Sequence, residues 1–196
     1  MKLIKVFHAT DKKNLDKIKV EGLRPLAKNR PKELQVADHA FDLVAERLGI
    51  THRRKGLFAW PKETNGAIEV EVDPEKALVL HQAWIDLAWG IVEGIFGRIP
   101  LDKQTEFRTM EPWELYNQMI GIRIPEGTVD DALRVLGEKY WRNGVLLKDY
   151  NKRTAKELTD AVIIMRRKFG GLMLWLDHEV VLGTEIIPIE RIQINL

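Results

Sequence analysis

Strand-like segments lie at both ends of this 196-residue chain, and segments with helical periodicity lie between them. Leu3 to Phe7 is an apolar run, and Ala67 to Val72 alternates between apolar and acidic residues as a half-buried strand does. Further strands are predicted by the apolar runs at 161–165, 172–176 and 179–182. Strands at both ends with helices between them predict one α+β domain over 1–196 with a mixed, mainly antiparallel sheet, and not a repeated βαβ series.

Residues 83–160 form the helical middle of the chain, which we interpret as an insertion within that domain. Trp84 to Phe96 and Glu111 to Met119 are helix candidates, and Thr128-x-x-Asp131 resembles a capping box at the start of a third helix. Outside the insertion, Thr10 is expected to cap the helix that follows the first strand, and Gly22 to end it.

Composition narrows the class of protein and of site. The chain has no cysteine, which excludes disulfides, cysteine-bound zinc and a thiol nucleophile and fits a cytoplasmic protein. No window approaches the roughly 20 apolar residues of a membrane span, so we expect no membrane association. The five histidines lack metal-ligand spacing, so we expect no metal site.

Charge is unevenly distributed along the chain. Residues 1–56 contain 14 Lys and Arg against 7 Asp and Glu, whereas the whole chain has a net charge of +2. A basic half of this kind attracts phosphates or nucleic acid, and the alternative interpretation is a solvated surface of lysine-rich helix faces. No aromatic residues interleave the basic run Arg53-Arg54-Lys55, so a nucleic-acid groove is weakly supported.

Three short segments stand out in a chain that lacks glycine-rich phosphate loops and the H-E-x-x-H and G-x-S-x-G patterns. The first is Val6-Phe7-His8-Ala9-Thr10, followed by Gly22-Leu23-Arg24-Pro25. The second is Gly56-Leu57-Phe58-Ala59-Trp60, and the third is Asp177-His178-Glu179 with Ile187 and Ile192 after it. In this order the segments resemble the NAD-binding core of the ADP-ribosyltransferase family, over roughly 1–75 and 160–196. The resemblance implies that family's split sheet, enclosing one NAD cleft, with 83–160 as a helical insertion.

The resemblance also implies roles for individual residues. Glu179 is the expected catalytic residue, because a carboxylate stabilises the positive charge that develops as the glycosidic bond to nicotinamide breaks. His8 is expected to hydrogen-bond the adenosine ribose. The backbone of Ala9 is expected to hold the nicotinamide carboxamide, and the hydroxyl of Thr10 to lie near the nicotinamide ribose.

Aromatic and basic residues complete the expected NAD site. Phe58 aligns with the family's tyrosine and is expected to stack on the nicotinamide ring, with Trp60 as the alternative on the same strand face. Arg24, or the cluster at 53–55, is expected to meet the pyrophosphate through charge-assisted hydrogen bonds. We therefore expect His8, the Phe58/Trp60 strand and Glu179 to meet in one cleft.

The implied activity is NAD-dependent transfer of ADP-ribose to a protein or nucleic-acid acceptor, with release of nicotinamide. An RNA 2′-phosphotransferase of the same fold is one alternative. A non-catalytic module that binds NAD or ADP-ribose and a protein-interaction module are others. Ala9 stands where the family has glycine, and Phe58 where it has tyrosine. These departures leave turnover and the acceptor open, and the sequence carries no prediction of oligomeric state.

Overall fold

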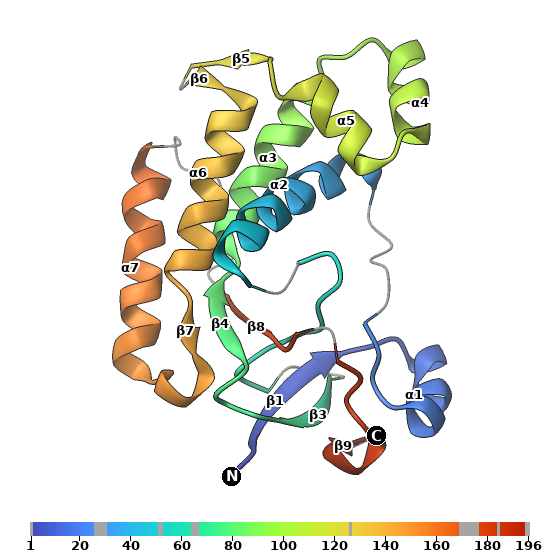
Figure 1. Ribbon diagram of the computed structural model, residues 1–196, viewed down its shortest axis with the longest axis vertical. Coiled ribbons are helices and arrows are strands. Elements are labelled where there is room, and N and C mark those ends of the chain that lie inside the picture. Colours follow the sequence, from blue (N-terminus) through green and yellow to red (C-terminus); the bar gives the residue numbers. More distant parts are fainter. Residues whose placement is uncertain are drawn as a thin grey trace.

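The computed structural model describes residues 2–25, 31–50, 53–63, 67–125, 127–168, 177–183 and 185–194, with the backbone alone for 165–168. Among the paired strands of these ranges, every pairing is antiparallel. Helices cover the sheets and dominate the middle of the chain (Figure 1). The predicted mixed α+β class with antiparallel sheets is therefore confirmed.

The first sheet pairs strands from the two ends of the chain. Its order is β1-β3-β9, with β1 at Ile4–Ala9, β3 at Ala67–Val72 and β9 at Ile192–Gln193. In β3 the apolar residues are buried and the acidic ones are half-buried, which confirms the predicted alternation.

The second sheet has the order β2-β8-β4-β7. These strands are Phe58–Ala59 (β2), His178–Val181 (β8), Leu78–His81 (β4) and Val145–Leu146 (β7). An isolated bridge joins the two sheets, since Phe7 and Trp60 exchange backbone hydrogen bonds of 2.9 and 2.7 Å. β2 therefore lies between β1 and β8.

Two hydrophobic cores lie on opposite faces of the second sheet. Leu80 and Val181 face a large core made with the helices, whereas Val79 and Val180 face a smaller core shared with the first sheet. Successive residues of a strand point to opposite faces. Position 179 therefore faces the large core, on the same side as Val181.

Four helices supply most of the large core, to which Val162 of the last helix also belongs. These are α2 (Lys32–Leu48), α3 (Ala83–Phe96), α5 (Pro112–Met119) and α6 (Val129–Arg142). α2 and α6 approach closely at Gly137, where an added Cβ would lie 3.1 Å from a methyl group of Val44. The capping box predicted at Thr128 and Asp131 starts α6, which confirms that helix.

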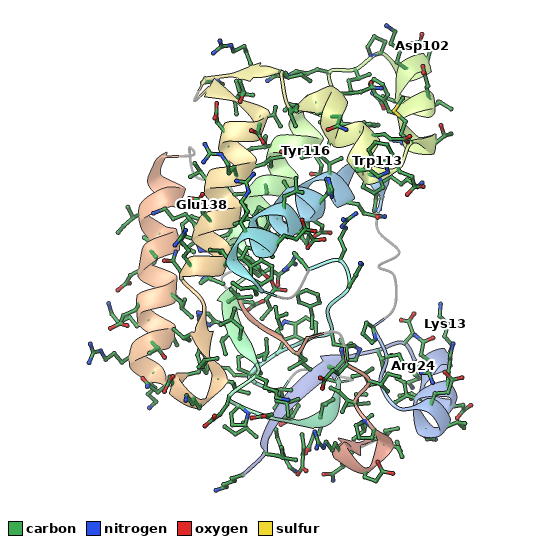
Figure 2. All side chains as sticks on the ribbon, in the orientation of Figure 1. Lys13, Arg24, Asp102, Trp113, Tyr116 and Glu138 are labelled. Carbon is green, nitrogen blue, oxygen red and sulfur yellow. The ribbon has the colours of Figure 1, made fainter. Side chains whose placement is uncertain are left out.

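The remaining elements of 83–160 lie around these helices. α4 (Leu101–Thr109) buries none of its residues, and a small hairpin of β5 (Arg123–Ile124) and β6 (Gly127–Thr128) precedes α6. Asp102 of α4 lies at the opposite end of the molecule from Arg24 (Figure 2). In the described ranges, none of the helices has the length and apolar character needed to cross a bilayer.

The N-terminal helix begins later than the sequence predicts. A 3₁₀ turn at Lys12–Asn14 precedes α1, which spans Leu15–Glu21, so Thr10 lies outside its first turn and the predicted N-cap is wrong. The predicted end is confirmed, because Gly22 has φ +74° and a Cβ there would lie 2.4 Å from the carbonyl oxygen of Ile187.

The strand predicted over 161–165 is wrong, because α7 spans Lys152–Lys168. The side chain of Asn151 accepts hydrogen bonds from the backbone N–H groups of Arg153 and Thr154, at 2.9 and 3.3 Å, and so caps the helix. Leu158 and Val162, four residues apart, are its buried face. The strand predicted at 172–176 lies outside the described residues.

Candidate functional site

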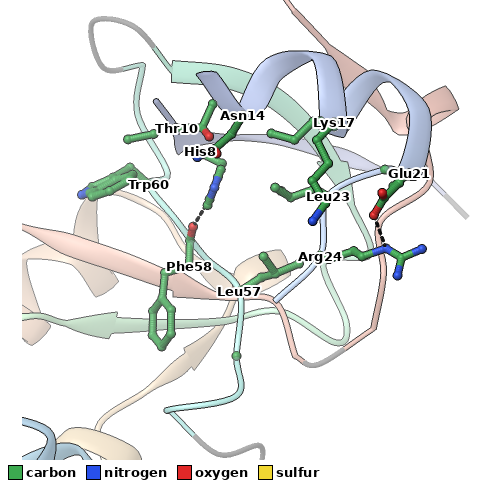
Figure 3. A pocket seen from close by; sticks show the side chains of 14 residues that line it. His8, Thr10, Asn14, Lys17, Glu21, Leu23, Arg24, Leu57, Phe58 and Trp60 are labelled. Atoms are coloured by element: carbon green, nitrogen blue, oxygen red, sulfur yellow. Dashed lines mark hydrogen bonds and ion pairs between the residues drawn. The ribbon is translucent and has the colours of Figure 1, made fainter. Parts of the chain in front are cut away.

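A cavity of about 200 Å³ lies beside the ends of β1 and β2, beneath α1 (Figure 3). Its wall includes every residue predicted from the sequence to bind a cofactor, namely His8, Ala9, Thr10, Arg24, Phe58 and Trp60. These residues come from three separate segments of the chain. The fold therefore brings all six of them to one cavity.

His8 presents a hydrogen-bond acceptor in this cavity. Its Nδ1 lies 2.6 Å from the carbonyl oxygen of Phe58, and because a carbonyl accepts, Nδ1 must carry the proton. Burial lowers the pKa of His8, and the hydrogen bond to Phe58 partly opposes that effect. The imidazole is therefore neutral at pH 7, and its Nε2 keeps a lone pair.

α1 supplies one side of the cavity that the sequence analysis missed. Asn14, Lys17, Ile18 and Glu21 line it, spaced three and four residues apart as one side of a helix requires. This spacing is visible in the sequence and was the available signal for that side of the cavity. Lys17 adds a second cation to Arg24, whose guanidinium lies 3.4 Å from the Glu21 carboxylate.

The two aromatic residues of β2 differ in their relation to the cavity. The carbonyl group of Phe58 faces His8, whereas its ring points away from His8 (Figure 3). The ring instead contacts the Arg53 guanidinium, with 4.7 Å between the guanidinium carbon and the ring centroid. Trp60 is half-buried and is the aromatic side chain available to a ligand in the cavity.

Glu179 is not among the residues that line this cavity. It lies on β8 and is 5% exposed, on the strand face that the helices cover. Its Oε1 accepts a hydrogen bond of 2.7 Å from the Tyr140 hydroxyl of α6. The expected meeting of Glu179 with His8 in one open cleft is therefore not observed.

Arg53 holds the Glu179 carboxylate inside the protein. Nη1 and Nη2 of Arg53 lie 2.5 and 3.3 Å from the two carboxylate oxygens, and Nη1 also contacts the Tyr140 hydroxyl. Nε donates to Asp38 at 2.8 Å. Burial favours the neutral guanidinium, but the charge of Glu179, with those of Tyr140 and Asp38, raises the pKa of Arg53 overall.

The expectation that the basic loop at 53–55 faces solvent or a pyrophosphate is wrong for Arg53, which is 1% exposed. Its backbone N–H donates to Asp42 at 2.5 Å, and the side chain of Arg54 binds the same carboxylate at 2.6 Å. Asp38 and Asp42 are one turn apart on α2 and both are buried. This pair of acids on an otherwise apolar helix face was the available signal for a buried cation.

Phe58 connects the cavity to the Glu179 cluster. His8 contacts its carbonyl oxygen, and Arg53, which binds Glu179, contacts its ring. A single residue of β2 therefore separates the candidate ligand site from the expected catalytic carboxylate.

A pair of histidines lies beside Glu179, where His178 of β8 pairs with His81 of β4. His81 is 1% exposed and its ring packs edge-on against that of His178, with 4.9 Å between centroids. Its Nδ1 accepts from the backbone N–H of Ala83 at 3.2 Å, and its Nε2 has no hydrogen-bond partner among the described residues. Burial, helped by the charge of His178, lowers the pKa of His81 to about 4.

Within the ranges that the structure describes, no group of three or more His, Asp and Glu residues is placed to hold a metal ion. The candidate site therefore consists of a ligand cavity and, behind Phe58, a buried carboxylate cluster. In comparisons with known proteins, the chain matches no family model, no curated protein and no solved structure.

Proposed function

We propose that this protein binds NAD, or another nucleotide that carries the ADP-ribosyl group, in the cavity beneath α1. The observation that carries the proposal is that six residues chosen from a sequence resemblance, in two of its three motif segments, line one cavity. His8 and Phe58, 50 residues apart in the chain, meet there.

The chemistry of the wall fits a nucleotide. A ribose hydroxyl can donate a hydrogen bond to the unprotonated Nε2 of His8. Lys17 and Arg24 supply positive charge for a pyrophosphate. A cavity of about 200 Å³ is smaller than the roughly 300 Å³ at which ligand pockets usually begin. The cavity is therefore too small for a whole dinucleotide, and the proposal places one nucleoside in it and the rest along its opening.

In this conformation, binding of NAD is favoured over transfer of ADP-ribose. Transfer requires a carboxylate at the reacting ribose, and Glu179 is instead bound to Arg53 and Tyr140. ADP-ribosyl transfer to a protein or nucleic-acid acceptor is the second candidate function. The strand order favours it, because β2 lies between the strands that carry His8 and Glu179.

Titration with NAD, followed by calorimetry and by tryptophan fluorescence, tests the proposal. We expect saturable binding to the wild type and affinity about 5- to 30-fold weaker in His8→Ala and Lys17→Ala, because each removes a polar contact worth roughly 1–2 kcal/mol. Lys19→Ala is the matched control, since Lys19 lies on the same helix, does not line the cavity and pairs with Asp16. Absence of binding, or equal weakening in all three variants, would contradict the proposal.

A further inference from the structure

We propose that Arg53 is an autoinhibitory contact, whose guanidinium occupies the place beside Glu179 that a planar cationic group of the bound nucleotide would otherwise take. This inference rests on the proposed function. It adds that the protein has a latent ability to cleave NAD, which Arg53 suppresses.

The surroundings of Arg53 form a seat for a flat cation. Its guanidinium carbon lies 4.7 Å from the ring centroid of Phe58 and 5.1 Å from that of Tyr140. Aromatic rings near a cation and a carboxylate hydrogen-bonded to it both favour delocalised positive charge. The nicotinamide ring of NAD is also flat and positively charged, and Glu179 supplies the carboxylate.

Contacts other than the one with Glu179 also hold Arg53 in place. Asp38 binds the side chain of Arg53, and Asp42 binds its backbone N–H and the side chain of Arg54. Both acids belong to α2, so the loop is tied to the helix by contacts that do not involve Glu179. An occupant tethered in this way competes with a free ligand at a high effective concentration.

The position of Phe58 makes the competition direct. A nucleotide in the cavity contacts the β2 segment from the His8 side, and Arg53 covers the ring of the same Phe58 from the Glu179 side. A ligand that extends past Phe58 toward Glu179 must displace Arg53. Such a ligand shifts the equilibrium between the conformation with Arg53 bound to Glu179 and the one with Arg53 displaced. The shift is only as large as the ligand's preference for the displaced conformation.

Removal of Arg53 leaves the Glu179 carboxylate free to hydrogen-bond the ribose beside nicotinamide. The bond between ribose C1′ and the nicotinamide nitrogen then breaks, and its electron pair leaves with nicotinamide, which becomes neutral. The oxygen of a water molecule forms the new bond to C1′, and one proton passes to solvent. The products are ADP-ribose and nicotinamide, and Glu179 stabilises the positive charge between the two events.

The test is nicotinamide release from NAD by wild type, Arg53→Met and Arg53→Met/Glu179→Gln. We expect a rate at least about tenfold above wild type in Arg53→Met and a return to the wild-type rate in the double variant. Arg153→Met is the control for loss of an arginine, because Arg153 is exposed and pairs with Glu157 on α7, and we expect no rise. A purely structural ion pair predicts loss of stability in Arg53→Met without any gain in release.

Arg53→Lys keeps the test decisive if Arg53→Met does not fold. Lysine retains the charge but cannot bridge Glu179 and Asp38 with a planar fork, so a smaller rise is expected. NAD binding by wild type without a rise in either folded variant overturns the autoinhibitory role and leaves the proposed function intact. Wild-type release at the rate of Arg53→Met also overturns it. Absence of NAD binding in every protein overturns the proposed function itself.

Discussion

Arg53 and Glu179, 126 residues apart in the chain, form a buried ion pair in which Nη1 lies 2.5 Å from Oε1. The pair joins the loop after α2 to the strand at the opposite end of the chain. Under the proposed autoinhibitory role, it also keeps the carboxylate behind Phe58 from a ligand.

Arg53→Ala should lower the free energy of unfolding by about 3–5 kcal/mol, because it leaves buried carboxylates without their guanidinium. Urea denaturation followed by circular dichroism measures the change. Arg153→Ala is the surface comparison, since its partner Glu157 is exposed, and it should leave the urea midpoint nearly unchanged. A loss below about 1 kcal/mol in Arg53→Ala would show that the pair is not closed in solution.

Gly137→Val should destabilise the protein by roughly 1–3 kcal/mol, because its Cβ alone would lie 3.1 Å from Val44 and 3.2 Å from Phe41. Gly90→Ala, in α3, is the opposite case. Nothing lies within 4 Å of its added Cβ, so helix propensity should raise stability by about 0.5–1 kcal/mol. Thermal unfolding of both variants checks the packing of α2 on α6. Equal changes in melting temperature in the two variants would contradict that packing.

Stability should fall as the pH is lowered from 6.5 towards 4, in part through His81. In the unfolded chain this histidine titrates near 6.5, and in the folded protein near 4, so the unfolded state binds more protons between these values. The stabilisation is complete above pH 6.5 and is lost as pH falls through the folded value, with a size of about 3 kcal/mol. His81→Asn should flatten this dependence. NMR titration of His81 near 6.5 in the folded protein would contradict the expectation.

NAD affinity should be constant from pH 8 down to about 6.5 and should decline only at lower pH, where His8 becomes protonated. Burial lowers the pKa of His8, so the acceptor form persists below the ordinary histidine range. Calorimetry at several pH values measures the profile. His8→Gln, which does not titrate, should bind more weakly and without this decline, and an unchanged profile in that variant would assign the pH dependence to another group.

Sequence patterns predicted correctly those elements that depend on only a few neighbouring residues. The alternation of Ala67 to Val72 and the capping box at Thr128 both depend on neighbouring side chains, and both are confirmed. α7 was missed because its apolar run at 162–165 is rich in β-branched residues. The cap at Asn151, eleven residues earlier than Val162, was the better signal.

The burial of Arg53 could not be predicted from its neighbourhood in the sequence, which is a basic loop. Its partners come from α2, α6 and β8, and their positions depend on how the helices pack on the sheet. The cavity was easier to predict, because β1 and β2 each place a short motif at one strand end. The roles of those residues toward NAD remain predictions.

The bridge between Phe7 and Trp60 has a consequence for how the molecule unfolds. Through it β1 of the first sheet is hydrogen-bonded to the segment of β2 in the second sheet, and Trp60 of the bridge also lines the cavity. A ligand bound in the cavity would contact residues of both β1 and β2. Because such a ligand binds the folded protein only, it should raise the melting temperature of both sheets together.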